Sequence, residues 1–263
     1  MGQIVLITGG SSGIGDSVAR ILAADGCRVY EMSRGESAPI DRVHIKGDIT
    51  SGQDVERTVE YVIKKEGRID ILINNAGFGI SGAAEFTDME DAARQMDVNF
   101  LGMARMCRAV LPHMRKNGRG RILNLSSVAA AVPIPFQAFY SASKAAVNAY
   151  SLALANEVRP YGVSVCAVMP GDIKTGFTAA RKKQSAGDEA YGGRIGRSVA
   201  KMERDEREGM EPAAAGRIIA RIARRRKVKP LYAIRVDYQA IALLARLLPA
   251  RLLNWLVYQL YAR

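Results

Sequence analysis

Cysteine and histidine are scarce in this chain of 263 residues, which contains three cysteines and two histidines. Cys27, Cys107 and Cys166 have no CxxC spacing, and no cluster of cysteine and histidine is present. Structural zinc sites need about four such ligands at short spacings, and disulfide frameworks need paired cysteines. The sequence therefore predicts no metal site, and thiols that stay reduced in a cytoplasmic protein.

The chain also lacks a long uninterrupted apolar run. It begins with a strand-like segment and no basic stretch before an apolar core, so we expect no signal peptide. Its leucine-rich tail over 237–263 is interrupted by Arg246 and Arg251. A transmembrane helix needs about 20 mainly apolar residues, so we expect no span. Pro249 predicts two short helices in this tail.

Acidic residues are few at the C-terminal end. The net charge of the chain is +12, and residues 213–263 contain eleven Lys or Arg but only one acid, Asp237, which leaves +2 for the rest. The basic run 217–229 has no interleaved aromatic residues, and no DNA-reading motif is present, so we expect no nucleic-acid partner.

Short apolar runs alternate with longer amphipathic stretches over the first two thirds of the chain. This alternation predicts an α/β fold: a single Rossmann-type, doubly wound parallel sheet flanked by helices, with a helical C-terminal extension, in one domain over 1–263. The predicted strands are 3–8, 28–32, 43–46, 70–74, 121–126 and 163–168, and the predicted helices are 13–25, 52–66, 88–114 and 138–159.

A glycine-rich segment, Thr8–Gly15, follows the first predicted strand and leads into a helix. Glycines permit a tight turn and let backbone amides approach a pyrophosphate, and the helix N-terminus adds favourable dipole charge. A purely structural turn is the alternative. The position directly after a strand favours a dinucleotide site.

The end of the second predicted strand indicates which dinucleotide binds. NAD sites usually place an acid there, but this chain has Ser33 and Arg34, and Glu31 lies inside the strand. A guanidinium suits a 2′-phosphate, so we predict NADP(H) as the cofactor, unless Arg34 is only an exposed turn residue. Asp48 follows the third strand and is expected to bind the adenine amino group, to cap the 52–66 helix, or to do both.

Tyr140 and Lys144 stand four residues apart in a predicted helix, so their side chains share one face. A fixed ammonium favours the phenolate form of a neighbouring tyrosine. Such a tyrosine can exchange a proton with an alcohol or a carbonyl near neutral pH. Together with the upstream nucleotide loop, this pair predicts an oxidoreductase.

The chain resembles the classical short-chain dehydrogenases/reductases over about residues 1–180, and its C-terminal extension resembles the hydroxysteroid and retinol dehydrogenase-like branch. The matching motifs occur in order and in register. They are Thr8–Gly15, Asp48, Asn74–Gly77, Asn99, Ser126–Ser127, Tyr140–Lys144 and Pro170–Thr175.

The resemblance implies four catalytic residues. Ser127, rather than Ser126, would bind the substrate oxygen, and Tyr140 would be the general acid or base. Lys144 would hold the nicotinamide ribose, and Asn99 would interrupt its helix and fix a proton-relaying water. Asn74 would brace the sheet. The implied cofactor-binding residues are Gly9, Ser11, Ser12, Gly13, Ile14, Gly15, Ser33, Arg34, Asp48, Ile49, Asn75, Ala76, Gly77, Tyr140, Lys144, Pro170, Gly171, Ile173 and Thr175. Family members also often form dimers or tetramers through two long helices, so we expect a homo-oligomer.

The substrate side is expected to be apolar and poor in charge, with a wall formed by Val132, Pro133, Ile134, Pro135, Phe136 and Phe139. Residues 172–211, polar and glycine-containing, are either a substrate lid or a solvated loop. The leucine-rich, basic extension 230–263 either covers the pocket or a subunit interface, or contacts a membrane surface peripherally. Each alternative favours a hydrophobic substrate.

We therefore predict an NADP(H)-dependent enzyme that interconverts an alcohol and a ketone or aldehyde on a steroid, retinoid or lipid-like molecule. Two alternatives stay open. One is a 3-oxoacyl thioester reductase, because acyl-carrier proteins are acidic and the basic tail could bind one. The other is a non-catalytic NADPH-binding regulatory protein.

Overall fold

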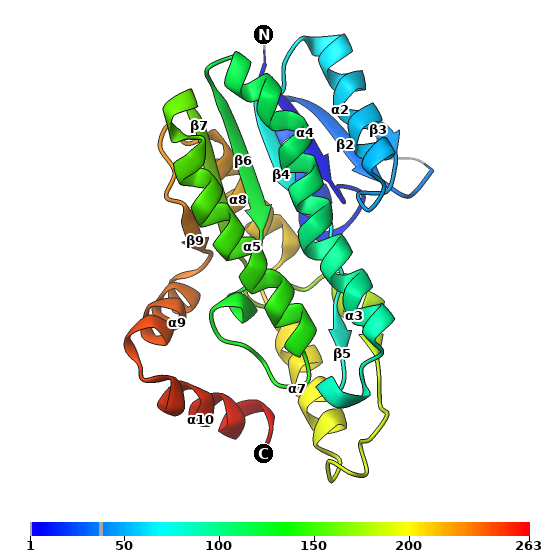
Figure 1. The fold of residues 1–263 in the computed structure, drawn as a ribbon, viewed down its shortest axis with the longest axis vertical. Coiled ribbons are helices and arrows are strands. Elements are labelled where there is room, and N and C mark those ends of the chain that lie inside the picture. The colour runs from blue at the N-terminus through cyan, green and yellow to red at the C-terminus, as the bar shows by residue number, and fades with distance from the viewer. Residues whose placement is uncertain (1, 37–38) are drawn as a thin grey trace.

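The computed structural model describes residues 2–36 and 39–263. A seven-stranded parallel sheet forms its centre, in the order β3-β2-β1-β4-β6-β7-β9 (Figure 1). This order reverses direction at β1, which confirms the predicted doubly wound α/β fold. The strands are β1 Ile4–Thr8, β2 Arg28–Ser33, β3 Val43–Lys46, β4 Ile71–Asn74, β6 Gly120–Leu125, β7 Val163–Met169 and β9 Leu231–Ala233.

Helices bury both faces of the sheet, which is why its strands are continuously apolar. In β1, Ile4 and Leu6 pack into one core with helices α2 Gly52–Glu66, α4 Met103–Lys116 and α5 Ala138–Glu157. Val5 and Ile7 point the other way, into a second core with α1 Gly13–Ala24 and α8 Pro212–Arg224. Figure 1 shows α4 and α5 side by side across the first of these faces.

The helix predicted over 88–114 is not continuous. It consists of α3 Met89–Met96, a π-helical segment η2 Asp97–Gly102, and α4. The wider turn of η2 contains Asn99, so the expected interruption of the helix at this residue is present. Such π-helical turns inside α-helices occur frequently at functional sites.

Several short elements have no counterpart among the sequence predictions. The strands β5 Ile80–Ser81 and β8 Lys182–Lys183 pair with each other, and β9 adds a seventh strand to the main sheet. Three-residue helical turns occur at η1 Ala84–Phe86, η3 Val128–Ala130 and η4 Arg159–Tyr161. Elements of two or three residues are too short to show a hydrophobic period.

The segment 172–211 is partly helical, with α6 Phe177–Ala180 and α7 Arg194–Arg207 on either side of a loop. The C-terminal extension forms α9 Val236–Leu247 and α10 Ala250–Tyr261, which separate at Pro249 as predicted. In Figure 1 these two helices lie at the end of the molecule towards which the strands β6 and β7 point. Within the described part of the chain, no helix is both long and apolar enough to cross a membrane.

Candidate active site

A cavity of about 1110 Å³ runs along the carboxyl ends of the strands, where open α/β sheets bind ligands. It contains most of the residues that the sequence singled out. Those that line it are Gly9, Ser11, Ser12, Gly13, Ile14, Ser33, Arg34, Asp48, Ile49, Asn75, Ala76, Gly77, Ser127, Tyr140, Lys144, Pro170, Gly171, Ile173 and Thr175. Asn99 and Gly15 do not line it.

The glycine-rich loop leaves no room for side chains at its turns. Gly9 has a φ of +63°, and a Cβ there would lie 2.9 Å from the Cα of Ala76. Gly13 has a φ of +56°, which L-residues rarely adopt. A Cβ on Gly15 would lie 2.3 Å from the carbonyl oxygen of Gly9, so Gly15 fits α1 against the loop and makes no contact with the cavity.

Arg42 supports this loop through a hydrogen bond to its main chain, a role that nothing in the sequence pattern indicated. Its side chain is fully buried and donates to the carbonyl oxygen of Gly10 at 2.7 Å. The same guanidinium pairs with Asp16 at 2.9 Å and with Asp41 at 2.7 Å. A buried charge with this many partners fixes the main chain around it, and two of these partners, Gly10 and Asp16, are distant from Arg42 in sequence.

The adenosine end of the cavity contains Ser33, Arg34 and Asp48. The Oγ of Ser33 is buried and has no partner among the described residues, whereas Arg34 is exposed along the cavity wall. Burial alone would raise the pKa of Asp48, but hydrogen bonds from Thr50 and the charge of Arg34 lower it. Asp48 does not cap the 52–66 helix, because the Oγ of Ser51 accepts from the N–H of Asp54.

Glu31 does not line the cavity. It lies within β2, is fully buried, and binds Nδ1 of His44 at 2.6 Å. The orphaned hydroxyl of Ser33, the glycine turns and the guanidinium of Arg34 together fit a dinucleotide with a 2′-phosphate. All of these residues belong to motifs that were recognised in the sequence.

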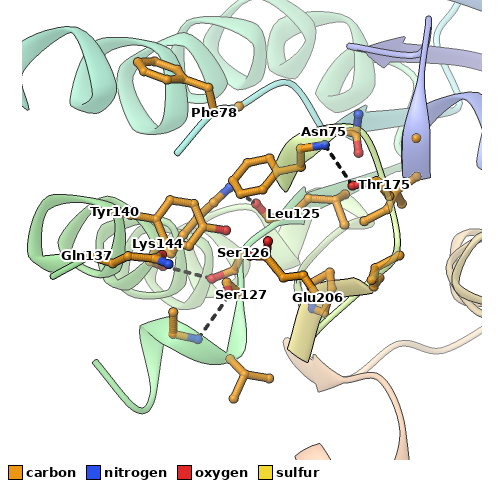
Figure 2. Close-up of a pocket in the computed structure, with 18 of the residues that line it drawn as sticks. Asn75, Phe78, Leu125, Ser126, Ser127, Gln137, Tyr140, Lys144, Thr175 and Glu206 are labelled. Carbon is orange, nitrogen blue, oxygen red and sulfur yellow. Dashed lines mark hydrogen bonds between the residues drawn. The ribbon is translucent and has the colours of Figure 1, made fainter. Parts of the chain in front are cut away.

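Tyr140, Ser127 and Lys144 meet in the middle of the cavity (Figure 2). The Nζ of Lys144 lies 5.8 Å from the ring centroid of Tyr140 and donates to the carbonyl oxygen of Leu125 at 2.8 Å. Burial lowers the pKa of Lys144 to about 8. Ser127 caps η3, because its Oγ accepts from the N–H of Ala129 at 3.1 Å.

The pKa of Tyr140 differs from the sequence-based expectation. Burial raises it to about 12, although a hydrogen bond with Ser127 and the charge of Arg181 act in the opposite direction. We expected Lys144 to favour the phenolate, but burial dominates at this site. The phenol is therefore protonated near neutral pH and is ready to donate a proton.

Two asparagines and a serine hold the frame of the site. Asn99 uses its amide fully within the protein, bonding both backbone groups of Phe78 at 2.9 Å and the hydroxyl of Ser143 at 3.1 Å. Asn74 braces the sheet as predicted, donating to Asn124 at 2.8 Å. Ser126 donates to the carbonyl oxygen of Lys144 at 2.9 Å, and its hydroxyl is thereby occupied.

The apolar part of the cavity differs from the predicted wall. Val132 and Ile134 line it, but the other four predicted wall residues (Pro133, Pro135, Phe136 and Phe139) do not. Most of the apolar lining comes instead from segments distant in sequence. These residues are Phe78, Phe177, Met202, Ile241, Leu244, Leu248, Leu253, Leu256, Val257 and Leu260.

The expectation of few charges near the substrate was wrong. Asp172 and Glu206 both line the cavity, and both raise the pKa of Tyr140. Glu206 lies on α7 and Asp172 follows β7, so only tertiary packing brings them to the tyrosine. Gln137, which is 5% exposed, lines the same region.

The C-terminal extension forms part of the cavity wall. Tyr238 on α9 stacks over Gly171, where a Cβ would lie 2.0 Å from the ring, and its hydroxyl donates to Asp172 at 2.6 Å. This packing agrees with the reading of the extension as a pocket cover. The outer sides of α9 and α10 remain exposed, with 71% of Leu247 and 54% of Trp255 accessible.

Comparisons with known proteins agree with this geometry. The family model described as short chain dehydrogenase matches residues 3–186. A protein of Bacteroides thetaiotaomicron named 3-ketodihydrosphingosine reductase is 45% identical over 238 residues, covering 87% of this chain and 88% of that protein.

Solved structures give the same result. A short-chain dehydrogenase from Streptomyces avermitilis has a TM-score of 0.86 at 30% identity, covering 97% of this chain and 96% of its own. A structure titled ElxO with NADP bound has a TM-score of 0.76 at 25% identity, covering 91% of this chain and 100% of that chain. The chain therefore belongs to the short-chain dehydrogenase/reductase family.

Proposed function

We propose that this short-chain dehydrogenase/reductase uses NADPH to reduce the ketone of a long-chain, lipid-like substrate. The observation that carries the proposal is the continuity of the cavity. The compartment that contains Ser127 and Tyr140 opens directly into an apolar one lined by α9 and α10. The name of the Bacteroides relative, a reductase of a long-chain keto compound, supports the same substrate class.

The cofactor residues are proposed to act as follows. The glycine loop and the N-terminus of α1 would hold the pyrophosphate, and Ser33 and Arg34 the 2′-phosphate. The main chain would run close to the adenine ribose at Asn75, Ala76 and Gly77. The loop from Pro170 to Thr175 would close over the nicotinamide. When bound, the cofactor supplies a hydride to the substrate carbon.

Tyr140 is the proposed proton donor. Its phenol, protonated because burial raises its pKa to about 12, would donate a proton to the carbonyl oxygen as the alcohol forms. Ser127 would hold that oxygen by a hydrogen bond. Lys144 would bind the nicotinamide ribose and supply positive charge beside the tyrosine.

Two further roles are proposed, one for Asn99 and one for the segment 172–211. A proton relay at Asn99 would have to use its main-chain carbonyl, because its side-chain amide is occupied by Phe78 and Ser143. The segment 172–211 is proposed to be a substrate lid, since Phe177, Met202 and Glu206 all line the cavity.

Initial rates test the proposal. We expect NADPH-dependent turnover of a long-chain ketone such as 3-ketodihydrosphingosine, and much less with keto-steroids, retinal or an acetoacetyl thioester. Tyr140→Phe should lower kcat by about 10²- to 10⁴-fold while NADPH still binds. Preference for the thioester would favour the acyl-carrier alternative. Tight NADPH binding without turnover of any carbonyl would favour a regulatory protein.

We also propose peripheral membrane contact through α9 and α10. Leu243, Leu247 and Trp255 are each more than half exposed, and the segment 213–263 carries ten net positive charges. Basic residues near an anionic bilayer contribute about 1 kcal/mol each. We expect co-sedimentation with phosphatidylserine vesicles that Leu247→Glu weakens. Leu152→Glu, on the exposed side of α5, is the matched control and should have no effect.

A further inference from the structure

Asp172 is a carboxylate that lines the cavity and forms no ion pair with any described residue. It accepts a hydrogen bond from the hydroxyl of Tyr238 at 2.6 Å, and among the described residues no lysine, arginine or histidine forms an ion pair with it. Burial raises its pKa, as do the charges of Asp205 and Glu206, and these effects outweigh the hydrogen bond from Tyr238 and the charge of Arg235, which lower it. A half-buried carboxylate in this position is stabilised when a cation joins it.

The other two carboxylates of this cluster already have partners. Glu206 pairs with the fully buried Arg181 and accepts from the hydroxyl of Thr178 at 2.6 Å. Asp205 pairs with Lys201 at 3.1 Å. Of the three carboxylates, only Asp172 therefore forms no ion pair, because the nearby Arg235 pairs with Asp237. Each carboxylate oxygen of Glu206 still has a second lone pair for a further donor.

Gln137 provides an independent observation on the same part of the cavity. Its side chain is 5% exposed and lines the cavity, and its Nε2 donates to the sulfur of Met202 at 2.6 Å. Its Oε1 accepts no hydrogen bond from any described residue. Met202 and Glu206 are four residues apart on α7 and therefore share a face. A nearly buried acceptor oxygen thus lies on the same side of the cavity as the carboxylates.

We propose that Asp172 and Glu206, together with Gln137, bind a protonated primary amine of the substrate. An ammonium group has three donors and no acceptor, which matches two carboxylates and an amide oxygen. The substrate class is then a long-chain ketone that carries an amine close to its carbonyl. This inference rests on the proposed ketone reduction and adds to it which polar group the site recognises.

The location of the acids fixes where that amine lies. Both carboxylates line the same cavity as Tyr140, whose phenol would protonate the carbonyl oxygen, and both act on it electrostatically. The apolar lining from α9 and α10 begins at Tyr238, the residue that binds Asp172. A substrate in this cavity would place its carbonyl at Tyr140, its amine at Asp172 and its alkyl chain along α9 and α10.

The test compares two ketones of equal chain length. One is 3-ketodihydrosphingosine, which carries a primary amine, and the other is the matching 1-hydroxy-3-ketone without the amine. We expect kcat/KM to favour the amine by about 10- to 100-fold, the range for a hydrogen bond to a charged group. The N-acetyl derivative of 3-ketodihydrosphingosine is a third ketone, in which the amine has lost its charge. Its kcat/KM should fall towards that of the amine-free ketone.

Asp172→Asn is the matched variant, because it removes the charge and keeps the shape. We expect it to reduce the preference for the amine by most of that 10- to 100-fold. Asp205→Asn removes a neighbouring charge that does not line the cavity, and it should keep the preference. If Asp172→Asn does not fold, as judged by thermal unfolding, the comparison of the three ketones with the natural chain still decides.

The outcomes separate this inference from the proposed function. Equal kcat/KM for the amine and amine-free ketones would overturn the amine subsite while leaving ketone reduction intact. A preference that survives Asp172→Asn and Glu206→Gln would also overturn it. Failure to reduce any of the three ketones with NADPH would overturn the proposed function itself.

Discussion

The ring of Tyr238 lies so close to Gly171 that a Cβ on this glycine would be 2.0 Å from Cζ of the tyrosine. Gly171 belongs to the loop after β7, and Tyr238 belongs to α9 of the C-terminal extension. The contact therefore joins the extension to the loop proposed to cover the nicotinamide. A side chain at 171 would force these two segments apart.

Gly171→Ala should destabilise the protein by about 1–3 kcal/mol, the usual cost of overpacking, and should reduce activity more than stability alone explains. Denaturant unfolding and initial rates with NADPH measure the two effects. The matched control is Gly52→Ala, because a Cβ at Gly52 meets nothing within 4 Å. Normal activity in Gly171→Ala would show that the extension does not shape the site.

Arg34 should decide the choice between NADPH and NADH. Arg34→Ala is expected to lower kcat/KM for NADPH by about 10- to 100-fold, because a charge-assisted bond to the 2′-phosphate is lost, with little change for NADH. Arg108→Ala, an exposed arginine on α4 outside the cavity, serves as control. Equal losses with both cofactors would mean that Arg34 does not contact the 2′-phosphate.

Arg42 and Arg20 bind the same carboxylate from different environments. Arg42 is fully buried and Arg20 is 58% exposed, and each lies 2.9 Å from Asp16. Arg42→Ala should cost about 3–5 kcal/mol and weaken NADPH binding, since it leaves buried partners unpaired. Arg20→Ala should leave the stability nearly unchanged, because an exposed ion pair contributes little. Unfolding curves and cofactor titrations of the two variants check this; similar losses would contradict it.

Lys144 should lower stability at neutral pH, because burial lowers its pKa from 10.5 to about 8. Between pH 8 and 10.5 the unfolded chain keeps the proton that the folded chain has lost, so stability rises with pH through this window. Below pH 8 the cost is complete, at most about 3 kcal/mol. Above 10.5 it disappears.

Lys144→Met should therefore abolish activity and yet raise stability at pH 7 by up to about 2 kcal/mol, once the lost bond to Leu125 is allowed for. The gain should vanish as the pH approaches 10.5. Urea unfolding at pH 7 and pH 10 measures it. A variant that is less stable than the natural chain at pH 7 would show that the ammonium is well compensated where it lies.

The sequence by itself determined the parallel sheet and the position of the nucleotide loop. Apolar runs in β1, β4 and β7 require burial on both faces, and the glycines of the loop permit a turn that other residues resist. The four-residue spacing of Tyr140 and Lys144 likewise fixes their common face. These are local constraints, and each can be read from consecutive residues.

Only the tertiary structure decided what surrounds that pair. The bond between Tyr238 and Asp172 spans 66 residues, and Glu206 reaches the cavity from α7, a helix rich in charged residues. The charges of Glu206 and Asp172 raise the pKa of Tyr140 from these same distant segments. Such contacts depend on how whole elements pack, and they cannot be predicted from short-range periodicity in the sequence.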